Sequence, residues 1–319
     1  MTTFSSNFAQ PLEDFIREKR AVGHVYETSQ GNLQAFDRFC CEYYTAETQL
    51  TRTIAMHWGQ RRPDEHVNTL IRRITPIRQF AKYLNRIGVQ AYVIPRAAGA
   101  KGVRYIPHIF TKEELTAFFA ALDQCKYNVH SPVRHLVLPV IFRVLYCCGL
   151  RSSEVIGLRV ENLDLTTGKI TILQSKGHKD RVVMLSEDVL HLCQNYDQKV
   201  RCALPQRTHF FPNPQGSRYT QGFLGLAFHE FWDKAGILHV SGNRPRVHDF
   251  RHAFAVHRLN QWVKEGKDLN AYLPYLSMYL GHEHLTETDY YLHLVPEFFP
   301  VVTDKLEERF AHLLPEVNP

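Results

Sequence analysis

Residues 280–294 read Leu280-Gly281-His282-Glu283-His284-Leu285-Thr286-Glu287-Thr288-Asp289-Tyr290-Tyr291-Leu292-His293-Leu294. Glycine is a common helix terminator, so we expect one helix to end at Gly281 and another to begin near Leu285. The second helix carries two adjacent tyrosines, and successive helix positions diverge by about 100°, so only one of them can face a given partner. The segment therefore places a histidine nine residues before a tyrosine across a helix junction.

Three upstream segments carry the cationic and imidazole side chains that suit a phosphate ligand: Gly149-Leu150-Arg151-Ser152-Ser153-Glu154, Ser175-Lys176-Gly177-His178-Lys179-Asp180-Arg181 and His248-Asp249-Phe250-Arg251-His252. In the first, a serine can cap a short helix that follows Arg151. The second forms the turn between two expected strands, 170–173 and 181–185, so Lys176 lies at a hairpin tip. The third begins a helix whose N-terminus presents N–H groups and partial positive charge.

These residue types can break a phosphodiester bond without a metal. That chemistry needs a nucleophile, cations for the charge that grows on the nonbridging oxygens, and a proton for the leaving oxygen. A phenol with a pKa near about 10 is a weak nucleophile unless a base or a cationic field assists it. Arginine supplies such a field, because its planar fork donates in pairs to phosphate oxygens and keeps its charge.

In their order and spacing, the four segments resemble the active-site boxes of the tyrosine recombinases, the phage-integrase family, between Pro107 and Val295. The resemblance implies that Arg151 and Arg251 hold the phosphate and that Glu154 supports the first arginine. It implies further roles for Lys176 in protonating the leaving 5′ oxygen, with Lys179 as its rival, for His248 in proton transfer and for His282 in donating to the phosphate. Tyr291, rather than Tyr290, would be the nucleophile.

The resemblance also implies a reaction and its partners. Tyr291 would form a 3′-phosphotyrosyl link to double-stranded DNA, and the freed 5′ hydroxyl would attack the link on a partner duplex. The ester retains the bond energy, so no cofactor, ATP or divalent ion is expected. Four protomers on two DNA sites would exchange strands through a Holliday junction, and accessory directionality proteins are possible partners.

Composition and charge set the broad class. The chain has 319 residues, of which 44% are hydrophobic and 22% charged, and two globular domains are the better interpretation, although one large domain fits the length. Its seven cysteines lack CxxC spacing, which favours a reducing cytosol. We find neither a signal-peptide pattern nor about 18 consecutive apolar residues, so we expect a cytoplasmic protein without a membrane span.

Positive charge is concentrated between residues 61 and 104, which hold ten basic and two acidic residues. Arg78, Lys82 and Arg86 form a ridge at four-residue intervals on an expected helix and are candidates for contacts with DNA phosphates. A solvated helix face is the alternative. Thr75-Pro76 predicts a kink or a boundary in that helix, because proline disfavours helix at the residue before it.

The expected fold is mainly α with a small antiparallel β-sheet. We expect a helical core-binding domain over residues 1–97, a linker over 98–107 rich in glycine and positive charge, and an α+β catalytic domain over 108–319. Thr111 and Glu114 predict a capping box at the start of the catalytic domain. The tail, 296–319, would pack either within the chain or against a neighbouring protomer.

Several side chains have simpler structural interpretations. Zinc binding by His248, His252, His282 and His284 is disfavoured, because Arg251 would lie beside the metal and paired cysteines are lacking. His252 is interpreted as a packing or hydrogen-bonding residue, and His284 and His293 as structural or solvent-facing, all without a catalytic role. Tyr272, Tyr275 and Tyr279 have the spacing of a buried helix face.

The resemblance implies that the function is site-specific recombination, integrating or excising a mobile element. A telomere-resolving or topoisomerase-like enzyme could use the same residues. A DNA-binding protein with a vestigial site is the alternative from another class.

Overall fold

The computed structural model describes residues 4–24, 26–95, 102, 105–173, 180–237 and 244–294. The chain divides into two compact units, Met1–Tyr105 and Ile106–Pro319, each with its own hydrophobic core. Helices dominate both, and the strands of the described part form one small antiparallel sheet, so the expected fold class is confirmed. The tail over 296–319 and the hairpin tip that carries Lys176 and Lys179 lie outside the described residues.

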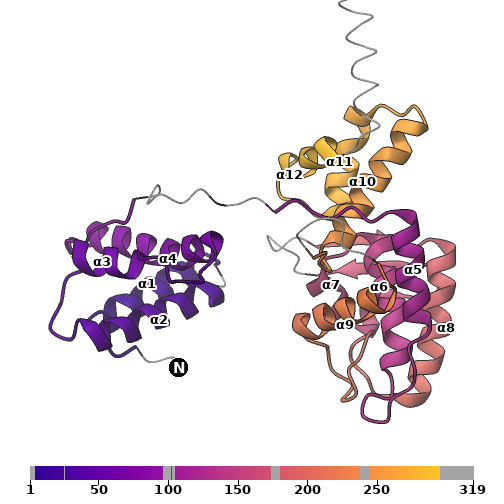
Figure 1. Cartoon of the computed structure of the whole chain (residues 1–319), viewed down its shortest axis with the longest axis horizontal. Helices are drawn as coiled ribbons and strands as arrows, with labels where there is room; N and C mark the ends of the chain where they lie inside the picture. Colours follow the sequence, from indigo (N-terminus) through magenta and orange to yellow (C-terminus); the bar gives the residue numbers. More distant parts are fainter. Residues whose placement is uncertain are drawn as a thin grey trace, which may run out of the picture. The chain divides into compact units, whose positions relative to one another are not determined.

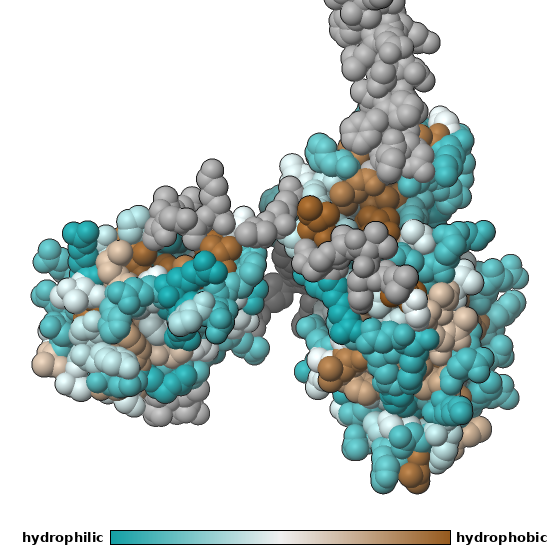
Figure 2. All heavy atoms as spheres, in the orientation of Figure 1, coloured by the Kyte–Doolittle hydropathy of each residue, from teal (hydrophilic) through white to brown (hydrophobic). Residues whose placement is uncertain are grey.

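Amphipathic helices build the first unit (Figure 1). They are α1 Ala9–Ala21, α2 Glu27–Tyr43, α3 Arg52–Gly59 and α4 Val67–Arg86. Their apolar faces meet in a core that includes Phe15, Phe36 and Phe80, all fully buried. The visible surface of this unit is mostly hydrophilic (Figure 2). Each helix buries one apolar stripe. This packing holds the short helices in place, although their residues have no notable helix propensity.

The proline in α4 does not end the helix. α4 continues through Pro76 to Arg86, so of the two expected outcomes, a kink or a boundary, the boundary is wrong. Its apolar stripe, which includes Ile74, Ile77 and Phe80, is buried on both sides of the proline. Packing of this stripe offsets the hydrogen bond that proline cannot donate.

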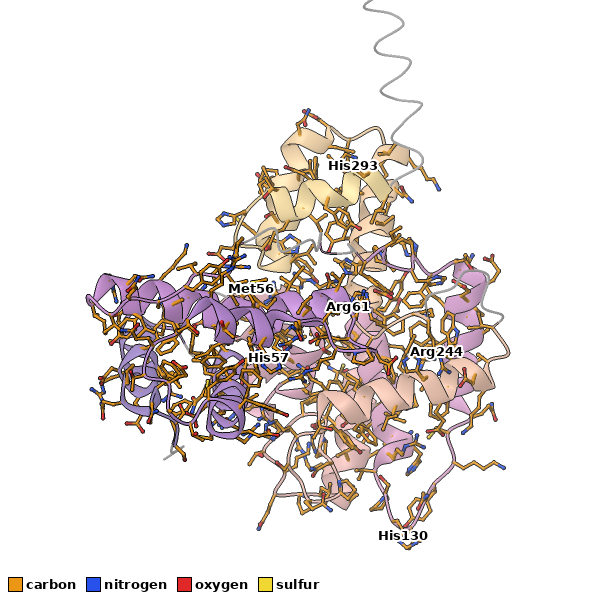
Figure 3. The ribbon with its side chains drawn as sticks, turned by 60° about the vertical axis from the view of Figure 1, so that its left-hand side comes forward. Met56, His57, Arg61, His130, Arg244 and His293 are labelled. Atoms are coloured by element: carbon orange, nitrogen blue, oxygen red, sulfur yellow. The ribbon has the colours of Figure 1, made fainter. Side chains whose placement is uncertain are left out.

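Arg73 differs from the exposed residues of the basic segment, because it is buried in an ion pair. Its Nε and Nη2 donate to the two carboxylate oxygens of Glu65 at 2.8 Å, and the guanidinium lies 4.9 Å from the Trp58 ring centroid. Arg61, labelled in Figure 3 beside α3, donates from Nε to the Glu65 carbonyl oxygen at 2.8 Å. The pair thereby ties the turn between α3 and α4 to the body of α4.

The second unit begins with the expected capping box, in which Thr111 accepts from the Glu114 N–H and the Glu114 side chain accepts from the Thr111 N–H. Its first helices are α5 Lys112–Asp123, α6 Arg134–Cys148, α7 Ser152–Ile156, α8 Glu187–Ala203 and α9 Gln221–Lys234. α6 is buried on most faces and packs against α5 and α8. It delivers Gly149 and Arg151 to the site.

The sheet lies beside these helices. Its strands are β1 Leu163–Asp164, β2 Lys169–Ile172 and β3 Arg181–Met184, preceded by the short helix η1 Val160–Asn162. β2 pairs antiparallel with β3 in a register that sets Ile170 opposite Val183, and both of these side chains are buried. The hairpin between them is the one expected from the sequence.

The last described helices form a subgroup at one end of the unit (Figure 1). They are α10 Asp249–Lys264, α11 Leu269–Leu280, α12 Thr286–Asp289 and the 3₁₀ helix η2 Tyr290–Leu294. The buried stripe of α11 consists of leucines, including Leu273, Leu276 and Leu280, whereas Tyr275 is 65% exposed. The expectation of a buried tyrosine face is therefore wrong for Tyr275, because the leucines face α10. No helix in the described part of the chain has the length and apolar character of a membrane span.

We expect Arg73→Ala to lower the free energy of unfolding by about 3–5 kcal/mol, because Glu65 would keep a buried charge without its partner. Arg72→Ala removes an exposed neighbouring charge and should change the free energy by less than about 0.5 kcal/mol. Chemical denaturation of the whole chain measures both variants. Equal losses would contradict a specific role for the pair.

Candidate active site

The site is built at the end of α6. Gly149 closes this helix with a φ of 57°, and a Cβ there would lie 2.5 Å from Cδ1 of Phe254. The position therefore requires glycine for its conformation and for the close approach of α10. Leu150 is buried, and Arg151 follows at the turn into α7.

Glu154 caps α7 and pairs with the arginine at its start. Its Oε2 accepts from the Arg151 backbone N–H at 2.8 Å, and its Oε1 accepts from the Arg151 guanidinium at 2.9 Å. The expected serine cap is wrong, because the side chain of Glu154, three residues after Arg151, accepts from the Arg151 N–H instead. One side chain thus fixes both the backbone and the side chain of Arg151.

Arg181, the first residue of β3, also binds Glu154. Its Nη1 and Nη2 donate to Oε1 and Oε2 at 2.7 and 2.8 Å, and its Nε donates to the Tyr279 carbonyl oxygen at 2.9 Å. Burial alone raises the pKa of Glu154, but Arg181 and then Arg151 outweigh it and hold the pKa at about 2. Sequence reasoning gave Arg181 no role, although it ends the basic hairpin segment.

Arg251 is the most deeply buried cation of the site, at 2% exposure. Its Nη1 donates to the Gly149 carbonyl oxygen at 2.9 Å and its Nη2 to that of Leu280 at 2.5 Å. Burial, and then the charge of Arg151, lower its pKa to about 10, which leaves it protonated at neutral pH. α10 thus places this guanidinium between the ends of α6 and α11.

Arg151 and Arg251 both donate to backbone carbonyl oxygens at helix C-termini, and we call these two residues the arginine pair. Arg151 donates from Nη2 to the Gly281 carbonyl oxygen at 2.9 Å, one residue beyond the Leu280 carbonyl that binds Arg251. Helix C-termini carry partial negative charge, so these carbonyls attract cations. Two like charges are thereby held together at one place, ready to bind an anion.

Tyr291 lies against this pair. Its side chain is 3% exposed, and its hydroxyl lies 3.1 Å from Nδ1 of His252. Burial raises the pKa of the Tyr291 phenol, whereas the charge of Arg251 and a hydrogen bond from it act in the opposite direction. Tyr290 is half-buried, and its ring centroid lies 5.9 Å from that of Tyr291.

Histidines complete the surroundings of the phenol. Burial, followed by the charges of Arg251 and Arg246, lowers the pKa of His248 to about 4, so this ring is neutral at physiological pH. The His282 ring stacks on Tyr291 with centroids 6.0 Å apart, and its Nδ1 lies 2.7 Å from Oγ1 of Thr288. His248 and His282 therefore both border the same small volume as Tyr291.

The other residues singled out in the sequence have different outcomes. Lys176 falls outside the described residues, whereas His284 and His293 are exposed, His293 near the end of η2 (Figure 3). In the first unit, Arg78 donates to the carbonyl oxygens of Ile94 and Pro95 at 2.7 and 3.0 Å. Arg86 pairs with Glu18, and Lys82 is exposed.

Comparisons with known proteins agree with this geometry. The sequence model of the phage integrase family matches residues 108–297. An integrase/recombinase of Sinorhizobium fredii, y4rE, is 29% identical over 297 residues, which cover 92% of this chain and 93% of that protein. Tyrosine recombinase XerC of Lactobacillus delbrueckii subsp. bulgaricus is 29% identical over 232 residues, which cover 71% of this chain and 72% of that protein.

A solved structure shares the fold. The XerH site-specific recombinase, in a post-cleavage complex with a palindromic difH substrate, matches with a TM-score of 0.64 and 21% identity. The match covers 93% of this chain and 82% of that chain. The match shows that this chain shares the fold of that recombinase.

We expect Glu154 to make stability acid-sensitive. Its pKa falls from 4.5 to about 2 on folding, so the ionised form stabilises the fold above pH 4.5 and this contribution is lost as pH falls toward 2. The shift corresponds to about 3 kcal/mol. Glu154→Gln should remove this part of the pH dependence, as measured by denaturation between pH 7 and 2, whereas Glu161→Gln, at an exposed ion pair, should retain it. Parallel curves of unfolding free energy against pH for the wild type and Glu154→Gln would argue against a stabilising role for the ion pairs of Glu154 with Arg151 and Arg181.

Proposed function

The chain belongs to the phage integrase family, and we propose that it is a site-specific DNA recombinase acting through a 3′-phosphotyrosyl intermediate. One observation carries the proposal: a buried phenol, Tyr291, contacts an arginine pair whose charges are held together by backbone carbonyls. A DNA phosphate is the anion that would balance this charge. The phenol is then next to the phosphorus atom that it attacks.

In the proposed reaction each residue of the site has a task. The arginine pair binds the nonbridging oxygens and stabilises the charge of the transition state. Glu154 and Arg181 position Arg151, while His282 donates to the phosphate. His248 takes part in proton transfer, and Lys176 protonates the leaving 5′ oxygen. Tyr291 forms the ester, and reversal by a 5′ hydroxyl of another strand completes the exchange.

The domains and partners follow from this function. We propose that the first unit is a core-binding domain and that, together with the catalytic unit, it engages double-stranded DNA. A tetramer on two sites would perform the exchange, in which accessory proteins set the direction. The XerC relative and the XerH neighbour are named recombinases and y4rE an integrase/recombinase, which supports integration or excision of a mobile element as the outcome. All seven cysteines are free thiols, and we propose a cytoplasmic location.

Covalent trapping tests the enzyme class and the nucleophile together. On a nicked suicide duplex in EDTA, the wild-type chain and Tyr290→Phe should form a protein–DNA adduct, whereas Tyr291→Phe should form none because it lacks the attacking oxygen. Gel mobility under denaturing conditions detects the adduct. An adduct with Tyr291→Phe but not Tyr290→Phe would reassign the nucleophile, and no adduct with the wild type would favour a vestigial DNA-binding protein.

Salt dependence tests the DNA contacts of the first unit. Because Arg78 and Arg86 already have protein partners, the exposed Lys82 should contribute most directly. Lys82→Ala should reduce the slope of log affinity against log salt by about 0.9, the value for one neutralised phosphate. Lys199→Ala, at an exposed position on α8, is the control. Unchanged slopes for Lys82→Ala, with or without Arg78→Ala and Arg86→Ala, would remove this ridge from the interface.

A further inference from the structure

His252 lies in direct contact with the phenol of Tyr291. It follows Arg251 on α10, and η2 packs against this helix. The His252 Nδ1 lies 3.1 Å from the Tyr291 hydroxyl oxygen, and the ring centroids are 5.6 Å apart. The contact joins residues that are 39 positions apart in the sequence.

The surroundings of His252 favour its neutral form. Burial, followed by the charges of His248, Arg246, Arg251 and His282, lowers the pKa of His252 to about 3. The ring is therefore neutral at physiological pH. Arg251 donates to the phenol oxygen, since a guanidinium has no acceptor. In the tautomer that carries the imidazole proton on Nε2, the Nδ1 of His252 accepts the phenol O–H.

We propose that His252 is a catalytic residue that accepts the proton of Tyr291 as the phenol attacks the DNA phosphate. This proposal rests on the proposed function. The O–H bond breaks and its proton moves to Nδ1, while an electron pair of the phenol oxygen forms the new P–O bond. The bond from phosphorus to the 5′ oxygen breaks, and that oxygen takes its proton from the general acid.

Substrate charge controls the strength of this base. Without DNA, burial and then the surrounding histidines and cations make His252 a poor proton acceptor. A phosphodiester bound to the arginine pair brings a negative charge into the same volume, which opposes the effect of Arg251 and favours protonated imidazole. His252 therefore becomes more basic when the phosphate is in position, and Tyr291 is not activated in the empty site.

The neighbouring His248 is the competing base. Its ring lies 4.9 Å from the His252 ring, edge to face, and His252 in turn contacts Tyr291. The His252 ring is thus adjacent to the rings of His248 and Tyr291, and its Nδ1 is within hydrogen-bonding distance of the phenol oxygen of Tyr291. This contact favours His252 as the first acceptor of the proton.

The test compares His252→Ala and His252→Asn with the wild type in single-turnover formation of the covalent adduct between pH 6 and 9. Both variants should be slower at neutral pH by about 10²–10⁴-fold, the usual contribution of a positioned base. Their rates should rise more steeply with pH than that of the wild type, because solvent hydroxide must then remove the phenol proton. Asparagine can accept the hydrogen bond but cannot hold the proton.

His257→Asn is the matched control. His257 lies on the same helix, and its Nδ1 is 2.9 Å from the hydroxyl of Tyr146, so this substitution also alters a histidine–tyrosine pair. It should leave the adduct rate and its pH profile unchanged. Thermal unfolding and duplex binding of all variants separate loss of folding from loss of chemistry.

A duplex with sulfur in place of the leaving 5′ oxygen locates the defect, since a thiolate departs without a proton. The His252→Ala defect should persist on this substrate, whereas a general-acid variant, Lys176→Ala, should be rescued. A wild-type rate and pH profile in His252→Asn would reduce His252 to positioning and overturn the proposal, as would rescue of His252→Ala by sulfur. Failure of the wild type to form any adduct would instead refute the proposed function.

Discussion

The arrangement of the site depends on the carbonyl groups at two helix C-termini. Gly149 caps α6 and Gly281 caps α11, both in the left-handed conformation, and the carbonyl oxygens of these glycines accept from Arg251 and Arg151 respectively. These carbonyls would otherwise lack partners within their helices. The guanidinium groups satisfy them, and their partial negative charge offsets the repulsion between two cations. The same carbonyl groups thus mark the helix ends and hold the two guanidinium groups in place.

The balance of charge explains the protonation states around the phenol. Glu154 is one carboxylate shared by Arg151 and Arg181, while Arg251 is bound by neutral carbonyls, so the site retains excess positive charge. Burial first, and then that charge, lower the pKa values of His248 and His252 and keep both rings neutral, whereas the charge of Arg251 opposes the effect of burial on the pKa of Tyr291. A preorganised field of this kind acts on an anion without further rearrangement, which is its advantage for catalysis.

Local patterns were predictable where the cause was local. The capping box at Thr111, the helix end at Gly149 and the hairpin before Arg181 each depend on a few neighbouring residues, and the structure has all three. Errors arose where distant packing decided the outcome. α4 continues through Pro76 because its apolar stripe is buried, and Tyr275 is exposed because leucines of α11 face α10.

The sequence alone determined the family resemblance, the fold class and the residue types available for phosphate chemistry, because motif order and helical periodicity are properties of the chain itself. Only the tertiary structure decided which groups meet. Arg181 reaches Glu154 across 27 positions and His252 reaches Tyr291 across 39, since β3 packs near α11 and α10 packs against η2. Sequence spacing contains no such distances, and so the two contacts that most constrain Arg151 and Tyr291 emerged from the packing of helices and strands.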